Sequence, residues 1–234
     1  MSFGLLLLDK PLGLSSNGAT QRVRRLLRDD KAGHVGSLDP LATGMLPICL
    51  GEATKLAAEV LDGAKVYRFR IALGRRTSTG DVEGEVVEPC ATPPRAEETV
   101  GAVLARFVGP STQVPPMYSA LKRDGRPLYA LAREGLTVER AARPIHIERL
   151  ELLGSGPDWL DLRVRCGKGT YVRTLAEDIA RALGSCGHVA VLRREAVDPF
   201  QAAGMITLAE LESRVAAGQA PPLIDPDVAV QHLP

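Results

Sequence analysis

The chain has 234 residues, 45% of them hydrophobic and 24% charged, with a net charge of +1, so it is long enough for one large folded domain or a domain with an appendage. This composition excludes the disordered, collagen-like and coiled-coil classes. Its longest aliphatic run, residues 5–8, is far below the ~20 apolar residues of a membrane helix, and no basic region precedes it as in a signal peptide, so we expect a cytoplasmic protein without membrane contacts.

The N-terminal segment predicts a strand followed by a helix. Residues 5–8 are four leucines, typical of a short buried strand that ends at residues 9–11. Ser15 and Ser16 then cap a helix. Its apolar positions are Ala19, Val23, Leu26 and Leu27, and its other face carries Arg22, Arg24, Arg25 and Arg28.

Residues 33–51 show no periodicity. Four glycines, two prolines and short apolar pieces predict a structured loop, which is where we look for chemistry. Residues 53–61 favour a helix. Residues 65–73 alternate as a strand does, with Tyr67, Phe69, Ile71 and Leu73 on one face.

The middle of the chain is less regular. Residues 77–81 indicate a turn, 84–88 a returning strand, and Pro93 and Pro94 the start of a helix. Residues 109–135 hold three glycines and four prolines around one short helix at 127–134, so we expect a long irregular excursion, typical of a lid or binding loop.

Regular patterns return after residue 145. Residues 145–153, 159–166 and 189–197 predict strands, Thr170 is expected to cap a helix, and Thr207 with Glu210 forms a capping box for the last helix. Helices and strands mix without a strict βαβ order, which favours an α+β fold with a mixed or antiparallel sheet.

Basic charge is concentrated in three segments. Residues 22–31 hold five Lys or Arg against two acids, and residues 117–149 and 160–195 each hold seven against four. Such patches suit contact with an anionic polymer, although solvated surface charge is the simpler explanation of any one of them.

The cysteines and histidines do not form a metal site in the sequence. Cys49, Cys90, Cys166 and Cys186 are far apart, and the four histidines lie at no ligand spacing. We therefore expect buried thiols, with neither a zinc site nor a disulfide framework.

The run GHVGSLDPLATG at 33–44 is the most unusual segment. By pattern, Asp39-Pro40 is first a helix start, with Asp as the N-cap and Pro at the first helical position. Gly44 follows too soon for such a helix, whereas a carboxylate on a glycine-flanked turn is open to a ligand. A triad of Ser37, His34 and Asp39 has little support, because no G-x-S-x-G motif is present.

A second candidate is GKGTYVR at 167–173, between a predicted strand and a predicted helix. Its amides could hold a phosphate, but a tight turn explains the glycines equally well. Arg173 in the first helical turn opposes the helix dipole, which suggests a carboxylate partner. Tyr67 fits ordinary core packing, or a ring on which a base could stack.

Five motifs together resemble the TruB family of tRNA pseudouridine synthases. They are KPLGLSS at 10–16, GHVGSLDPLATGML at 33–46, KVYRF at 65–69, PPMYSALK at 115–122 and GTYVRTL at 169–175. The resemblance covers residues 3–225, with Ser15 where the family usually has Thr.

The resemblance implies a pseudouridine synthase fold, a mixed and largely antiparallel sheet flanked by helices. It implies a catalytic domain at 1–205 with a mobile thumb insertion at about 110–140, and a C-terminal helix and connector at 206–234. Bacterial members commonly continue into an RNA-binding PUA domain, which we expect to be absent here.

The resemblance also implies an isomerase that converts uridine 55 in the tRNA T-loop to pseudouridine without metal or other cofactor, acting as a monomer. Asp39 would be the nucleophile, at the uracil or at the sugar, with Arg173 as its partner and Tyr67 stacked on the flipped base. His34 would fill the space left in the T-loop. Further substrate contacts would come from Tyr171, Leu192, Lys10, Lys122, Arg123 and Arg126.

Two other functions stay open at this point. One is a non-catalytic module that binds or folds tRNA, and the other is a glycosidase-like hydrolase acting on a nucleoside. Retaining glycosidases need a second carboxylate ~5 Å from the first, and no second acid lies in the Asp39 motif.

Overall fold

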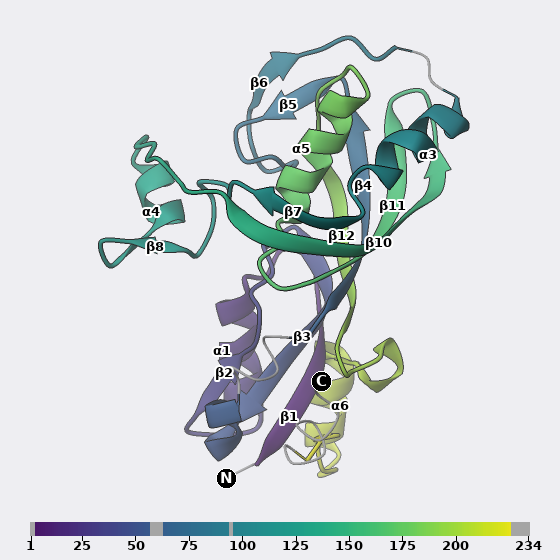
Figure 1. Cartoon of the computed structure of the whole chain (residues 1–234). Coiled ribbons are helices and arrows are strands. Elements are labelled where there is room, and N and C mark those ends of the chain that lie inside the picture. The colour runs from purple at the N-terminus through teal and green to yellow at the C-terminus, as the bar shows by residue number, and fades with distance from the viewer. Residues whose placement is uncertain (1–2, 57–62, 94–95, 226–234) are drawn as a thin grey trace. The chain divides into compact units, whose positions relative to one another are not determined.

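The computed structural model describes residues 3–56, 63–93 and 96–225 (Figure 1). The chain forms two compact units. The first consists of Met1–Arg68 with Leu192–Pro234, and the second of Phe69–Val191. The chain passes from one unit to the other within strands β4 (Lys65–Leu73) and β12 (Gly187–Val197).

The first unit is built on the antiparallel pair β1 (Gly4–Lys10) and β3 (Ala42–Leu50), in which Leu5 faces Cys49 and Lys10 faces Gly44. The short strand β13 (Ile206–Thr207) lies parallel to β1. On the other side, β12 runs parallel to β3, with Leu192 opposite Ala42. Strand β2 (Ala32–His34) also pairs with β3.

Both faces of this pair are covered. Leu6, Leu8, Leu46 and Ile48 pack with residues of α1 (Ser16–Leu26) and α6 (Leu208–Ala216). The opposite face, with Leu5, Leu7, Met45 and Cys49, packs against Val35, Val197 and Phe200. A strand buried on both faces has no polar side to alternate with, which explains the unbroken leucine run at 5–8.

The expectation that residues 33–51 form a loop was wrong for β2 and β3. The pattern misled because β3 is buried on both faces and contains Gly44 and Pro47. Gly44 has φ +100°, and a Cβ there would lie 2.1 Å from the carbonyl oxygen of Arg194. The glycine is therefore needed for the close approach of β12, and it does not mark a loop.

In the second unit the strand order is β12-β4-β11-β10-β7, with β11 (Trp159–Cys166), β10 (Arg143–Ser155) and β7 (Gly109–Gln113). Neighbouring strands β11, β10 and β7 pair antiparallel. Helix α3 (Glu97–Ala105) contacts β10 and α5 (Val172–Ala182). A separate two-stranded sheet joins β5 (Arg75–Thr77) and β6 (Val86–Pro89). The predicted α+β fold with a mixed, largely antiparallel sheet is confirmed.

The expected irregular excursion is more ordered than its composition indicates. Its first five residues are strand β7, which the pattern missed because the sequence GPSTQ has no apolar residue. Residues 122–127 form a hairpin of β8 (Lys122–Arg123) and β9 (Arg126–Pro127), closed by Asp124 and Gly125. Both turn residues have positive φ, as expected for an Asp-Gly hairpin turn. Helix α4 (Leu128–Arg133) follows, as predicted.

Several helix starts differ from the prediction. Helix α3 begins at Glu97, after the two prolines. The N-cap of α5 is Tyr171, while the Thr170 hydroxyl donates to the Gly167 carbonyl and closes the preceding turn. The capping box of Thr207 and Glu210 is confirmed. A 3₁₀ helix covers Gly51–Leu56, and the rest of the helix predicted at 53–61 lies outside the described residues.

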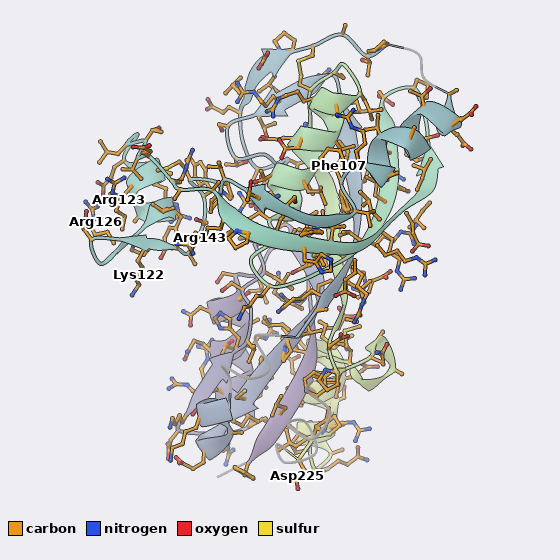
Figure 2. All side chains as sticks on the ribbon, viewed as in Figure 1. Phe107, Lys122, Arg123, Arg126, Arg143 and Asp225 are labelled. Atoms are coloured by element: carbon orange, nitrogen blue, oxygen red, sulfur yellow. A yellow bond between two sulfur atoms is a disulfide. The ribbon has the colours of Figure 1, made fainter. Side chains whose placement is uncertain are left out.

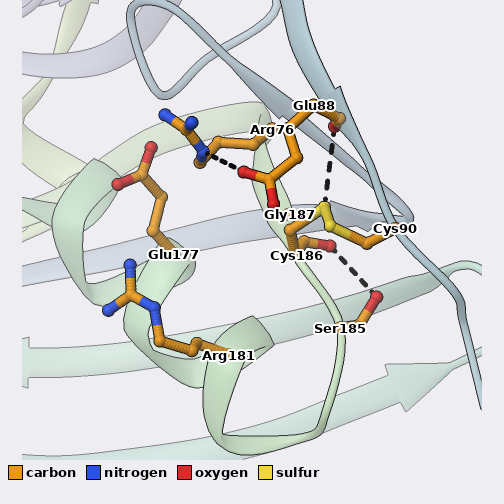
Figure 3. Close-up of a pocket in the computed structure, with 8 residues that line it drawn as sticks. All are labelled: Arg76, Glu88, Cys90, Glu177, Arg181, Ser185, Cys186 and Gly187. Carbon is orange, nitrogen blue, oxygen red and sulfur yellow. Dashed lines mark hydrogen bonds and ion pairs between the residues drawn. A yellow bond between two sulfur atoms is a disulfide. The ribbon is translucent and has the colours of Figure 1, made fainter.

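The cysteine prediction was wrong for one pair. Cys90 and Cys186 form a disulfide across 96 residues of sequence (Figure 3). The two cysteines meet because residue 90 lies just after β6 and residue 186 just before β12, a pairing that spacing cannot reveal. Cys49 and Cys166 are buried thiols, and burial raises the pKa of Cys49 to about 11.

No helix within the described residues is long and apolar enough to span a membrane.

Candidate active site

Asp39 lies on a turn in the first unit, directly before β3. The Ala42 amide donates to the Asp39 carbonyl over 3.0 Å, and the chain then enters the strand, so the helix start suggested by Asp39-Pro40 does not form. The ring of Pro40 fixes its φ angle in the turn. The residues that follow form β3, and the pairing of β3 with β1 and β12 competes with extension of a helix. The Asp39 residue is half-buried.

Three hydrogen bonds to neighbouring backbone groups fix this turn. The Ser16 hydroxyl accepts from the Leu38 amide at 2.7 Å and donates to the Leu38 carbonyl at 2.9 Å. The Gly13 amide donates to the Pro40 carbonyl at 2.9 Å. Ser16 is buried, so water does not compete for these bonds. Asp39 is therefore flanked on both sides by residues whose backbone is anchored to the start of α1.

Arg194 supports the same segment from β12. Its side chain is fully buried, and its Nη2 and Nε donate to the carbonyls of Gly36 and Met45 at 2.7 Å each. These carbonyls lie on either side of Asp39 in sequence. A rigid guanidinium that bonds to two fixed acceptors holds the distance between them.

His34 is connected to α1 and to the same segment. Its Nδ1 lies 3.1 Å from the Thr20 hydroxyl and its Nε2 lies 3.2 Å from the Ser37 hydroxyl. Because Thr20 donates its proton to the Ser16 carbonyl, the neutral ring carries its proton on Nδ1 and accepts from Ser37. Burial, and secondarily the Arg194 charge, lowers the pKa of His34, so the neutral ring is favoured.

The first unit holds three more of the predicted site residues. Leu192 is buried and pairs with Ala42, three residues from Asp39. Tyr67 is half-buried on β4. Lys10 is fully buried, and its ammonium donates to the carbonyls of Leu14 at 2.6 Å and Pro11 at 3.0 Å. The contact of Lys10 with substrate stays a prediction.

In the second unit, Arg173 lies in the first turn of α5 and is buried. Its Nη1 donates to the Thr79 carbonyl at 2.8 Å and its Nη2 to the Tyr118 carbonyl at 2.6 Å. Its Nε lies 3.7 Å from the carboxylate of Asp81, which is also buried. Asp81 is itself held by the Thr79 hydroxyl and the Glu83 amide. The carboxylate partner expected for Arg173 from the helix dipole is thus present within this unit.

Tyr171, the N-cap of α5, is held by hydrogen bonds to its backbone. The side-chain amide of Gln113 accepts from the Tyr171 N–H at 2.8 Å and donates to the Tyr171 carbonyl at 3.1 Å. That carbonyl also accepts the first helical bond, from Leu175. Gln113 is the last residue of β7 and is buried.

The described residues of the second unit line at least two cavities. One of about 480 Å³ is bordered by the turn at 77–80, residues 112–118 and α5. The other, of about 140 Å³, lies beside the disulfide, where Glu177 and Arg181 of α5 face Arg76 (Figure 3). Burial is the main cause that raises the pKa of Glu177, ahead of the lowering effect of Arg76. Neither cavity includes Tyr171 or Arg173 among its lining residues.

Three of the basic residues predicted to contact the substrate, Lys122, Arg123 and Arg126, lie together on the β8–β9 hairpin (Figure 2). Lys122 is exposed. Arg123 donates to the Glu139 carbonyl at 2.9 Å, and Arg126 forms an exposed ion pair with Glu134 at 2.5 Å. The hairpin carries this charge away from the sheet of its unit.

Among the described residues, no three His, Cys, Asp or Glu side chains lie together as a metal site would require.

Sequence reasoning missed Ser16 as a backbone anchor, Arg194, Asp81 and Gln113. Only Asp81 had a signal, since the position of Arg173 called for a carboxylate without saying which one. The partners of Gln113 and Arg194 are 58 and 149 or more residues away in sequence. No local pattern predicts such contacts.

The sequence matches two family models. Residues 24–172 match the TruB family pseudouridylate synthase N-terminal domain. Residues 173–224 match the tRNA pseudouridylate synthase B C-terminal domain.

Two similar curated proteins are both named tRNA pseudouridine synthase B. The tRNA pseudouridine synthase B of Chromohalobacter salexigens is 52% identical over 231 residues, which are 99% of this chain and 75% of that protein. The protein of the same name from Pseudomonas putida is 56% identical over 216 residues, which are 92% of this chain and 70% of that one.

A solved Cbf5–Nop10–Gar1 complex contains a chain of similar fold, with a TM-score of 0.78 and 28% identity. The match covers 98% of this chain and 62% of that chain, so the chain spans less than two thirds of this solved relative.

Proposed function

The chain belongs to the TruB family of tRNA pseudouridine synthases, the isomerases that convert uridine 55 in the T-loop of tRNA to pseudouridine, and we propose that it performs this reaction with Asp39 as the nucleophile. The observation that carries the assignment is the turn at Asp39. Leu38 and Pro40 are both anchored, so the carboxylate between them is held ready at a fixed backbone position.

The isomerisation breaks the bond from ribose C1′ to uracil N1 and forms one from C1′ to C5. The C5 proton is lost and N1 gains a proton, so no redox or metal cofactor is needed for the balance. Asp39 attacks the sugar or the uracil ring while the uracil turns in the pocket. At ribose C1′ it displaces N1 and is itself displaced when C5 bonds to C1′, and at the uracil ring its bond is released after C5 has bonded to C1′. Exclusion of water during this step prevents release of free uracil.

Arg173 is proposed to pair with Asp39 when tRNA is bound. A neighbouring guanidinium favours the ionised carboxylate that a nucleophile must be. The carbonyls of Thr79 and Tyr118 and the carboxylate of Asp81 support this role, since they fix the guanidinium in the second unit.

The remaining residues are proposed to hold the RNA. Tyr67 stacks on the flipped uracil, and Tyr171 and Leu192 line the pocket. His34, neutral and fixed by Thr20 and Ser37, takes the space that the base leaves in the loop. Lys122, Arg123 and Arg126 contact the phosphates of the T-arm. Lys10 is fully buried and bonds to the carbonyls of Pro11 and Leu14, so we propose that it serves the substrate site by fixing the segment before α1. We also propose that the protein acts as a monomer.

The test is Asp39→Asn, with Asp30→Asn as the control because Asp30 is an exposed carboxylate nearby in sequence. We expect Asp39→Asn to abolish tritium release from tRNA transcript labelled at uridine C5, with tRNA affinity within about threefold of wild type. Asp30→Asn keeps full activity.

Three outcomes would contradict the proposal. Activity of Asp39→Asn above background removes Asp39 as the nucleophile. Release of free uracil by the wild type indicates a hydrolase. Binding of tRNA by the wild type without any tritium release indicates a non-catalytic binding module.

A further inference from the structure

We propose that Gln113 is a positioning residue for the isomerisation, acting through the backbone of Tyr171 to place the start of α5 and, with it, Arg173. This inference rests on the proposed function, in which Tyr171 lines the uracil pocket and Arg173 pairs with the nucleophile. Gln113 itself touches neither substrate nor reacting atoms.

The contact is specific for a side-chain amide. At the Tyr171 backbone one donor and one acceptor stand side by side, and the Gln113 side chain presents the complementary acceptor and donor at 2.8 and 3.1 Å. It thus pairs with Tyr171 as a neighbouring strand would. Asn is one methylene shorter, and an ionised Glu offers two acceptors and no donor.

The position of this contact at the start of α5 couples Gln113 to the position of Arg173. Tyr171 is the N-cap of α5 and has no side-chain cap, so Gln113 satisfies the backbone N–H at the point where the helix begins. Arg173 follows two residues later and is packed against three acceptors with little room to adjust. A shift of the helix start by ~1 Å therefore moves the guanidinium by a distance that costs up to ~100-fold in rate.

Gln113 also marks the point where the chain leaves the sheet. It ends β7, and residues 114–121 lead from it to the hairpin, passing Tyr118, whose carbonyl holds Arg173. The same short segment is thus tied to α5 at two places, once at Tyr171 and once at Arg173.

The decisive variant is Gln113→Glu, studied as the single-turnover rate at saturating tRNA from pH 5 to pH 8. When ionised, the new carboxylate places an oxygen against the Tyr171 carbonyl, and we expect a rate at least ~10-fold below wild type at pH 8. When protonated, its O–H donates to that carbonyl and its C=O accepts from the N–H, which restores the pattern of Gln. Burial raises the pKa of such a carboxyl, so the transition falls within the range.

The ratio of the Gln113→Glu rate to the wild-type rate, both at saturating tRNA, is therefore expected to rise toward one as the pH falls. The tRNA dissociation constant, measured separately, should stay within threefold of wild type. Two control variants give the expected lower and upper limits of this ratio. Gln113→Leu cannot pair at any pH and gives a low ratio throughout. Ser111→Glu adds an exposed carboxylate to the same strand and gives a ratio near one throughout.

A ratio for Gln113→Glu that does not change with pH overturns the inference, because protonation restores the donor and acceptor that face Tyr171 and must then restore the rate. If Gln113→Glu does not fold, Gln113→Leu decides alone. A wild-type rate in that variant, or a loss of affinity as large as the loss of rate, overturns the inference. A wild type that makes no pseudouridine overturns the proposed function and this inference with it.

Discussion

Arg173 illustrates how a single buried side chain can serve several segments of a fold. Its guanidinium contacts the Thr79 carbonyl and the Asp81 carboxylate in the turn before β6, and the Tyr118 carbonyl in the segment after β7. The position of a cation at a helix start predicted one acidic partner. The two carbonyl partners followed no sequence signal, because backbone acceptors are available at every residue and only the tertiary fold selects among them.

Arg173→Lys is expected to lower the rate of pseudouridine formation by at least ~100-fold, with tRNA affinity nearly unchanged. A planar guanidinium reaches acceptors in three directions, and the point charge of Lys cannot. Single-turnover rates and filter binding check this. Arg181→Lys is the control, since Arg181 lies on the same helix but pairs with Asp178 at the surface. A rate near wild type in Arg173→Lys would show that charge alone suffices at this position.

His34 is expected to make the protein acid-sensitive. Its pKa in the folded chain is below the ordinary 6.5, so the unfolded chain binds more protons at pH values just below 6.5. The stability that the neutral ring contributes is complete above pH 6.5 and is lost as the pH falls through the folded pKa.

Urea unfolding of wild type and His34→Gln between pH 5 and pH 8 checks this sign. The variant has no ring to protonate, so the wild type should lose free energy of unfolding relative to it as the pH falls below 6.5. Parallel curves over the whole range would contradict the assignment of a neutral, desolvated ring.

At the scale of elements, the strands with a clear polar side were predictable and the others were not. Residues 65–73 and 159–166 alternate, and both strands have these bounds in the structure. Strand β3 was not predicted because burial on both faces removes the alternation of apolar and polar residues. Strand β7 was not predicted because its five residues are extended through pairing with β10. The Asp39 motif was found by its unusual composition, whereas its anchors Ser16 and Arg194 come from elements far away in sequence.

The β8–β9 hairpin is expected to supply phosphate contacts. Replacing Lys122, Arg123 and Arg126 by Ala should reduce the slope of log affinity against log salt by ~2 to 3 and weaken different tRNAs about equally. Isomerisation at saturating tRNA should change less than affinity. Arg149→Ala removes one exposed cation from β10 as a control. An unchanged slope in the triple variant would assign the grip on tRNA to other residues, such as the Arg side chains of α1.

At the scale of the whole chain, the four cysteines give a direct check on the fold of the second unit. The Cys90–Cys186 disulfide leaves Cys49 and Cys166 as thiols. Denatured protein that was never exposed to reductant should therefore titrate two thiols with Ellman's reagent, and four after reduction. Four thiols before reduction would show that the pair is reduced in the isolated protein.

The first unit is assembled from both ends of the sequence, and this imposes an order on biosynthesis. Strand β12 pairs with β3, β13 pairs with β1, and Leu5 exchanges backbone hydrogen bonds with Ile224. A ribosome makes Asp39 early, but Arg194, which holds the carbonyls on either side of it, emerges more than 150 residues later. The proposed nucleophile is therefore synthesised long before the side chain that supports its turn, and the first unit can be completed only after β12 and β13 have been made.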